Sequence, residues 1–273
     1  VYKRQLINIS TLELGRILSA RVEKDYENKV TGSVETDSRL MTQGGLFFAM
    51  RGENEDGHSY VQDAKARGAA VAVVEEIVDV EITQVVVRDT LVALGELASW
   101  LVGELKSHGS LRVIGITGSN GKTTTKNMLR EILSGSGNTI APIESFNNKV
   151  GAPISILRAD LETQFLVVEM GAEGIGSISY LAKMAQPDVA VILKVGMAHA
   201  GVFGGIENTA KIKAELAQEL GQDSTVVLNQ DDPMVVPMSK QTKATVRWFG
   251  TNSGADFWAS DISLSKLGTS FVV

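Results

Sequence analysis

The sequence contains no cysteine among its 273 residues. This absence excludes a scaffold held together by disulfides and a metal site built from thiolates. The sequence also lacks any run of about 18 consecutive apolar residues, so we expect no membrane span. No basic segment followed by an apolar core stands at the N-terminus. We therefore see no signal peptide and expect a cytoplasmic protein.

Positive charge is not in excess either, since the formal net charge is −6. An acidic chain argues against a general nucleic-acid-binding surface. A phosphorylated substrate is not excluded, because it needs only a local positive pocket. Hydrophobic residues make up 44% of the chain, which is typical of a soluble globular protein. The length is sufficient for two domains of ordinary size.

A glycine-rich loop stands near the middle of the chain, between a predicted strand over residues 111–116 and a predicted helix over residues 122–133. This order is the context that a phosphate-binding loop requires, because glycines let backbone N–H groups turn toward an anion and the helix adds its positive end. Ile116 stands where the usual pattern has its first glycine, so the loop is a shortened variant. The alternative is a plain strand-to-helix turn with a surface lysine. The expected binding residues are Gly118, Ser119, Asn120, Gly121, Lys122, Thr123 and Thr124.

Strands and helices alternate along the whole chain, which predicts an α/β fold. The polar segment 106–110 is the expected linker, and it divides a small α/β domain over residues 1–106 from a second domain over residues 107–273. In the second domain we expect a mostly parallel sheet that is covered on both faces and binds its ligand at the carboxyl ends of the strands. Residues 256–273 are expected to be β-structure, and they end within an apolar run, which suggests a truncated sequence.

Polar residues follow several of these strands. Glu169 ends the apolar strand 165–169, where a Mg²⁺ ligand belongs, although an ordinary loop acid would look the same. His199 follows the next strand and is equally well explained as a loop histidine bonded to the backbone. Spacing alone favours a solvated helix lysine at Lys213. Asn229 offers a donor and an acceptor to an adenine edge.

Local structure could also explain two other polar groups. The segment 229–232 is explained equally well as the start of a helix that Asp231 or Asp232 caps. Asn147 and Asn148 could contact a sugar or a pyrophosphate, but asparagine-rich turns are common for local reasons.

Together these motifs resemble the Mur ligase family, the ATP-dependent amino-acid ligases of peptidoglycan synthesis. The similarity lies in the run 117–124 and in the order of Glu169, His199, Lys213 and the sequence Asn-Gln-Asp-Asp at 229–232. Three motifs look like the MurF type: Asn147-Asn148-x-x-Gly151-x-Pro153, Glu169-Met170-Gly171-Ala172 and Ala198-His199-x-x-x-Phe203-Gly204. Three N-terminal motifs are similar to a uridine-nucleotide-binding domain shared by the MurE and MurF types: Thr36-Asp37-Ser38-Arg39, Gly45-Leu46-Phe47-x-Ala49 and Asp56-Gly57-His58.

The resemblance implies a role for each matching residue. Lys122 and the loop hold the ATP phosphates, and Asn229 faces the adenine. Thr123 and Glu169 hold one Mg²⁺, while His199 and a Lys213 carbamylated by CO₂ hold a second. The residues expected to bind the UDP-sugar substrate are Ser38, Arg39, Asp56, His58, Asn147 and Asn148.

For the MurF type, the implied reaction joins UDP-N-acetylmuramoyl-tripeptide and D-alanyl-D-alanine through an acyl phosphate, in a protein that we expect to be a monomer. Mur ligases carry a third, C-terminal domain of the dinucleotide-binding type, and nothing in this sequence matches it. We therefore expect the fragment to be inactive alone. The alternatives are a MurE-type ligase, which adds the third amino acid, and a non-catalytic nucleotide-binding module. A P-loop kinase or GTPase has no support, because no Asn-Lys-x-Asp motif is present.

Overall fold

The computed structural model describes residues 8–26, 28–52, 55–109, 111–142, 145–196, 203–266 and 268–273. The chain forms two compact units, and residues 149–164 belong to the first of them. Unit 1 comprises residues 1–111 and 149–164, and unit 2 comprises residues 112–148 and 165–273. The division into functional domains over residues 1–106 and 107–273 stays a prediction.

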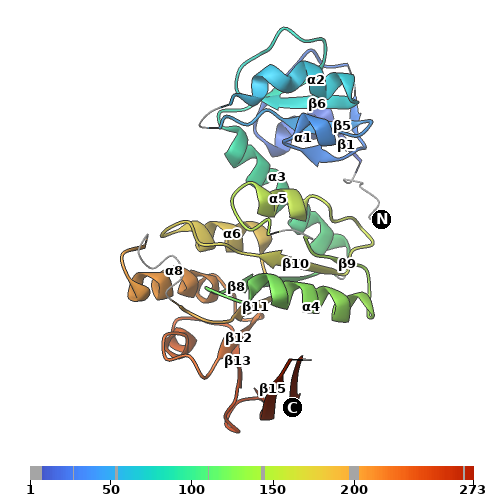
Figure 1. Cartoon of the computed structure of the whole chain (residues 1–273). Helices are drawn as coiled ribbons and strands as arrows, with labels where there is room; N and C mark the ends of the chain where they lie inside the picture. The colour runs from blue at the N-terminus through green and yellow to red at the C-terminus, as the bar shows by residue number, and fades with distance from the viewer. Residues whose placement is uncertain are drawn as a thin grey trace. The chain divides into compact units, whose positions relative to one another are not determined.

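Unit 1 is built on a five-stranded sheet (Figure 1). Its strands lie in the order β2 (Arg21–Glu23), β7 (Thr83–Val86), β6 (Ala69–Val74), β5 (Gly45–Phe48) and β4 (Val34–Glu35). All neighbours are parallel except β2 and β7. A small antiparallel pair joins β1 (Ile9–Ser10) to β3 (Lys29–Val30). The helical elements are α1 (Thr11–Ile17), η1 (Ser38–Leu40), η2 (Gly57–Tyr60), α2 (Val61–Ala66), α3 (Thr90–His108) and α5 (Gly151–Ile156).

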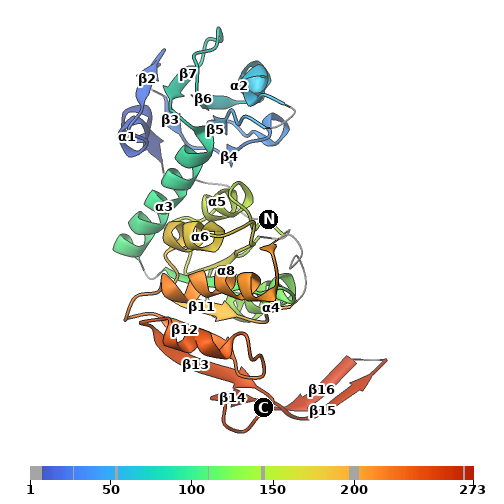
Figure 2. The same cartoon turned by 90° about the vertical axis from the view of Figure 1, so that its left-hand side faces the viewer.

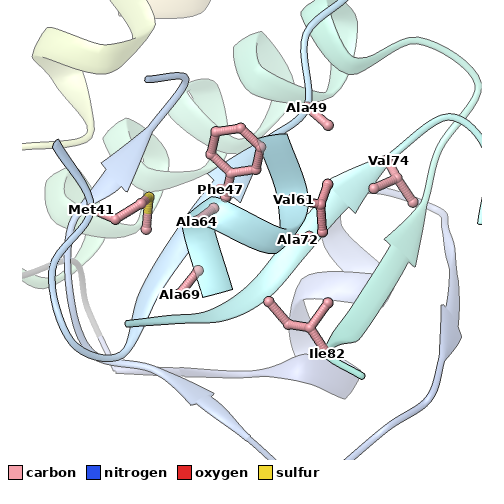
Figure 3. Close-up of a cluster of buried hydrophobic side chains, with 9 residues drawn as sticks. All are labelled: Met41, Phe47, Ala49, Val61, Ala64, Ala69, Ala72, Val74 and Ile82. Atoms are coloured by element: carbon pink, nitrogen blue, oxygen red, sulfur yellow. The ribbon is translucent and has the colours of Figure 1, made fainter. Parts of the chain in front are cut away.

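A core of apolar side chains joins the sheet of unit 1 to α2. Figure 3 shows Phe47 from β5 and Ala72 from β6 beside Val61 and Ala64 of the helix, and all four are at most 1% exposed. The alternation of the sheet sends these side chains to one face, and their removal from water stabilises the unit.

Helix α3 begins at Thr90 because the Asp89 carboxylate accepts from the N–H groups of Leu91 and Val92. It ends later than expected, since it continues through His108 into the segment 106–110 that we expected to be a linker. The basic residues Lys106 and His108 lie in its last turn, where a positively charged side chain interacts favourably with the negative end of the helix dipole.

Unit 2 contains a seven-stranded sheet in which every pair of neighbours is parallel. The strands are, in order, β14 (Phe257–Trp258), β13 (Thr245–Gly250), β12 (Thr225–Asn229), β11 (Val189–Ile192), β8 (Arg112–Thr117), β10 (Phe165–Glu169) and β9 (Thr139–Ile140). The predicted parallel sheet is thus confirmed. The order along the sheet reverses at β8, and ligands of such sheets bind at the carboxyl ends of the strands on either side of this point.

Helices cover both faces of this sheet. Ile114 and Ile116 of β8 point to the face that carries Leu129 and Leu133 of α4 (Lys122–Ser134). Gly115 points to the opposite face, where a Cβ would contact Leu216 of α8 (Ile206–Gln218). Helix α6 (Ser177–Ala185) packs beside α8 on that face. The central strand is therefore buried on both sides, as its nearly continuous apolar sequence predicts.

Residues 233–240, which follow the aspartates considered as a helix cap, form a turn and then the 3₁₀ helix η3 (Val236–Lys240). The Asp232 carboxylate accepts from Met234 N–H and from Val195 N–H, and Pro237 lacks an N–H group. Residues 256–273 are β-structure, as expected. Beyond β14 they form the antiparallel hairpin of β15 (Ser260–Ser265) and β16 (Gly268–Val272), whose two arrows Figure 2 shows side by side.

Candidate active site

The glycine-rich loop connects β8 to α4 at the carboxyl edge of the unit 2 sheet. Gly118 has φ 157° and Gly121 has φ 86°, in the left-handed region that favours glycine. The loop is tied to the chain that follows β11: Ser119 N–H donates to the Lys194 carbonyl over 2.7 Å, and Gly196 N–H donates to Ser119 Oγ over 2.8 Å. The predicted strand, loop and helix are therefore present, and the loop lies at the point where the strand order reverses.

Lys122 opens helix α4, and its Nζ donates to the carbonyl oxygen of Gly118 over 2.9 Å. The lysine thus curls back over the loop instead of extending into solvent. Gly121 precedes α4 and has no side chain to cap it, so the N–H groups at the positive end of the helix are not bonded by a capping side chain. Two positive features therefore converge where a phosphate group would bind.

Glu169, at the end of β10, is 1% exposed and is held by polar groups from two other segments. Thr123 Oγ1 donates to its Oε2 over 3.1 Å, and Asn147 Nδ2 donates to its Oε1 over 2.9 Å. Thr123 Oγ1 also lies 3.2 Å from Ser145 Oγ. The structure thus brings together Thr123 and Glu169, the two residues expected at one Mg²⁺ site, and adds Asn147, which we expected to bind the UDP-sugar substrate instead.

These oxygen atoms fit a Mg²⁺ ion. Mg²⁺ takes oxygen ligands in octahedral geometry, in which adjacent ligands lie about 2.9 Å apart, and it is usually held by one or two carboxylates together with substrate phosphates. The 3.1 Å between Thr123 Oγ1 and Glu169 Oε2 is close to that spacing. Within the described part of the chain, no three or more histidines, cysteines or acids gather into a metal cage. These oxygen atoms therefore suit an ion whose remaining ligands come from a nucleotide phosphate and water.

Lys213 lies on α8 and is 4% exposed, contrary to the solvated lysine that spacing alone favours. Burial, and then the positive charge of Lys122, lower the pKa of Lys213 to about 8. About one in ten amines with this pKa is neutral at pH 7, far more than for an ordinary lysine, and only the neutral amine is a nucleophile.

Sequence reasoning missed Lys126, which lies one turn after Thr123 on α4. Its side chain is 0% exposed, and its Nζ lies 4.0 Å from Glu169 Oε2. Burial lowers the pKa of Lys126, and the charge of Glu169 acts in the opposite direction. The one available signal was the spacing of three residues from Thr123, which puts both side chains on the same face of the helix.

Other predicted residues take part in local hydrogen bonds or are exposed to solvent. Asn229 Nδ2 donates to the Leu193 carbonyl over 2.8 Å, and its Oδ1 accepts from Asp231 N–H, so this amide joins the ends of β11 and β12. Asn120, Thr124 and Asn148 are exposed. His199 lies outside the described residues. The proposed contacts of these residues with ligands stay predictions.

Unit 1 contains a cavity of about 720 Å³ beside η1, and Ser38 and Arg39 are among its lining residues. Arg39 pairs with Asp37 at 2.7 Å, and its hydrogen bonds to that carboxyl hold the pKa of Asp37 below its usual value. Ser38 Oγ donates to Asp63 over 2.7 Å. Arg67 pairs with the same aspartate at 2.9 Å. The cavity is therefore lined by two guanidinium groups, of which sequence reasoning identified one, and each of them is paired with an aspartate of the same lining.

Asp56 and His58 do not line that cavity; they are hydrogen-bonded within unit 1. His58 is 8% exposed, its Nδ1 lies 2.6 Å from Asp56 Oδ1, and its Nε2 accepts from Glu75 N–H over 2.9 Å. Since Nε2 accepts, the neutral ring carries its hydrogen on Nδ1 and donates it to Asp56. Both ring nitrogens are thus bonded within unit 1, and the role predicted for this pair in substrate binding stays a prediction.

Two family models match this chain. A family model described as the Mur ligase middle domain matches residues 116–273, and one described as the Mur ligase family catalytic domain matches residues 31–99. The UDP-N-acetylmuramoyl-tripeptide–D-alanyl-D-alanine ligase of Mycobacterium tuberculosis (strain ATCC 25618 / H37Rv) is 38% identical over 96% of this chain and 56% of its own length. The chain thus spans little more than half of this relative.

Two solved structures are similar over most of the chain. A crystal structure of MurF from Acinetobacter baumannii has a TM-score of 0.87 and 34% identity, covering 98% of this chain and 61% of that one. The MurF ligase of Thermotoga maritima in complex with ADP has a TM-score of 0.75 and 31% identity, covering 88% of this chain and 55% of that one. In the described part of this chain, no helix is long and apolar enough to cross a membrane.

Proposed function

The chain belongs to the Mur ligase family, and from this premise we propose that it forms the ATP-binding and UDP-sugar-binding part of a cytoplasmic ligase of the MurF type. In the proposed reaction, the terminal carboxylate of UDP-N-acetylmuramoyl-tripeptide attacks the γ-phosphate of ATP. ADP leaves, and the product is an acyl phosphate. The amino group of D-alanyl-D-alanine then displaces phosphate and forms the new amide bond.

The observation that carries this proposal is the arrangement around the glycine-rich loop. Lys122 lies over the loop, and Thr123 and Glu169 share a hydrogen bond beside it. Phosphoryl transfer depends on positioning and on neutralising charge, so the protein needs no nucleophile of its own. A Mg²⁺ ion bound by Thr123 and Glu169 would neutralise phosphate charge. Lys122 would stabilise the transferring group from the loop.

Lys213 supports a second part of the proposal. A carbamate forms when a neutral amine adds to CO₂, and the pKa of about 8 makes the neutral form of Lys213 accessible. The product is an anionic oxygen donor in place of a buried cation. We propose that this group and His199 hold the second Mg²⁺, and that Asn229 contacts the adenine.

The cavity of unit 1 supports the proposal for the other substrate. Arg39 and Arg67 both line it, each held by an aspartate, and a guanidinium retains further N–H donors whose geometry matches phosphate oxygens. We propose that the uridine diphosphate group binds within residues 1–106 at this cavity, while residues 107–273 bind ATP.

The test compares amine substrates in the protein that carries this chain at full length. Phosphate release is measured with ATP, Mg²⁺ and UDP-N-acetylmuramoyl-tripeptide, with and without D-alanyl-D-alanine. We expect release that depends on D-alanyl-D-alanine and that is lost in Lys122→Ala. Release with a diamino acid and UDP-N-acetylmuramoyl-dipeptide instead would indicate the MurE type. Nucleotide binding without turnover on either pair would indicate a binding module and overturn the proposal.

A further inference from the structure

Lys126 is a buried cation next to the proposed metal ligand. Its side chain and that of Glu169 are 0% and 1% exposed, with 4.0 Å between Nζ and Oε2. A buried charge is costly unless an opposite charge lies near it, so removing one partner would leave the other uncompensated. Among the described lysines, only Lys126 and Lys213 are buried. An apolar residue could fill the same space without the free-energy cost of removing a charge from water. The lysine at this position therefore carries its charge at a cost in stability.

Both oxygens of the Glu169 carboxylate are engaged. Oε1 accepts from Asn147 Nδ2 over 2.9 Å. Oε2 accepts from Thr123 Oγ1 over 3.1 Å and faces Lys126 Nζ. Thr123 and Lys126 lie three residues apart on α4, so one face of this helix supplies both a ligand hydroxyl and a compensating charge.

We propose that Lys126 is a positioning residue that fixes the Glu169 carboxylate and balances its charge, so that a divalent cation binds to Thr123 and Glu169 only together with nucleotide phosphate. The proposal rests on the proposed function. A divalent cation at these oxygens would lie within a few ångströms of the ammonium and would be repelled by it. The pair of Lys126 and Glu169 carries no net charge, so the attraction that holds the metal must come largely from the phosphates.

The test measures Mn²⁺ binding to the chain directly, from the electron paramagnetic resonance signal of free Mn²⁺, with and without ADP. In the wild-type chain we expect weak Mn²⁺ binding without ADP and much tighter binding with it. Lys126→Met leaves the Glu169 charge uncompensated. This variant should bind Mn²⁺ about tenfold more tightly than wild type without ADP, so ADP should increase its Mn²⁺ affinity by a smaller factor. Lys126→Arg keeps the charge and should behave as wild type.

The matched control is Lys183→Met, which removes an exposed lysine from α6 and should leave Mn²⁺ binding unchanged. A purely structural role for Lys126 predicts the opposite sign, because a disordered site binds metal less well. Circular dichroism verifies that each variant is folded. If Lys126→Met does not fold, Lys126→Gln provides the same measurement.

Three results would overturn the proposal. The first is a folded Lys126→Met that binds Mn²⁺ without ADP no more tightly than wild type. The second is failure of both neutral variants to fold, which would assign the charge to folding alone. The third is a wild-type chain that does not bind ADP at all, in which case the proposed function falls with it. If ADP binds normally and only the Mn²⁺ result fails, the role of Lys126 alone is refuted.

Discussion

Lys122 Nζ lies 2.9 Å from the carbonyl oxygen of Gly118, four residues before it in the same loop. This bond holds a positive charge at the turn that the two left-handed glycines shape. The same charge lowers the pKa of Lys213 on α8. One lysine thus influences both the expected phosphate site and the pKa of a buried amine, so a single substitution of Lys122 can be followed by two measurements.

We predict that Lys122→Ala weakens binding of ADP to the chain by about tenfold or more, because a charge-assisted contact with phosphate is lost. Isothermal titration calorimetry measures the affinity. The same substitution should raise the pKa of Lys213, since the neighbouring positive charge is removed. The control is Lys211→Ala, an exposed lysine on α8. Equal ADP affinity in the wild type and in Lys122→Ala would refute the role of the loop lysine.

A second prediction concerns the pH dependence of stability. The pKa of Lys213 is about 8 in the folded chain, against an ordinary lysine value of 10.5, so the unfolded chain binds more protons between these limits. The free energy of unfolding should therefore rise with pH from about 8 to 10.5, by at most about 3 kcal/mol from this residue. Below about pH 8 the buried ammonium destabilises the fold.

The measurement for this prediction is urea unfolding at pH 7.5 and 9.5 in wild type and in Lys213→Met. Other groups titrate in the same range, so the quantity of interest is the difference between the two chains. The methionine variant should lack the rise attributed to Lys213. A rise of equal size in both would mean that this amine titrates in the folded chain as it does in the unfolded one.

Local sequence signals located several elements well. The apolar run at residues 165–169 became β10 with the expected bounds, and the helix expected over residues 122–133 became α4. These elements depend on short-range patterns, which the sequence contains in full. The placement of Thr123 beside Glu169 was also predictable, because parallel strands end at the same edge of the sheet.

What could not be predicted depends on contacts between distant residues. Helix α5 belongs to unit 1 through its packing against α3, more than 40 residues earlier in the chain. Lys126 was not identified because a helix lysine is normally solvated, and only its distance from Glu169 reveals the ion pair. Arg67 and Arg39 line one cavity although 28 positions separate them. Tertiary packing decides each of these cases.

A third prediction uses Gly171, which follows Met170 after β10. A Cβ at this position would lie 2.7 Å from Asn147 Oδ1 and 2.9 Å from the Asn147 carbonyl oxygen, and the N–H of Gly171 donates to that carbonyl. Gly171→Ala should therefore move Asn147 away from Glu169 and lower the free energy of unfolding by about 1–3 kcal/mol. Gly174→Ala, with open space around the added methyl, is the control. Chemical denaturation of both variants tests this, and equal stability would contradict it.

The last prediction concerns Glu215, two residues after Lys213. Its carboxylate is 8% exposed and accepts from Gly176 N–H over 2.7 Å and from Ser179 N–H over 3.0 Å, so it caps the start of α6 from a neighbouring helix. Glu215→Ala would leave both donors without this partner and should lower the free energy of unfolding by about 2–4 kcal/mol. Glu215→Gln keeps an acceptor oxygen and should cost less.

Glu207→Ala provides the matched control for Glu215, because Glu207 is an exposed acid at the start of the same helix. It should cost less than about 1 kcal/mol. Urea unfolding of the three variants ranks them. If Glu215→Ala were no less stable than Glu207→Ala, the two hydrogen bonds would not hold α6 to α8. Since α8 carries Lys213, loosening this contact should also let water reach the amine and move the pKa of Lys213 back toward its ordinary value.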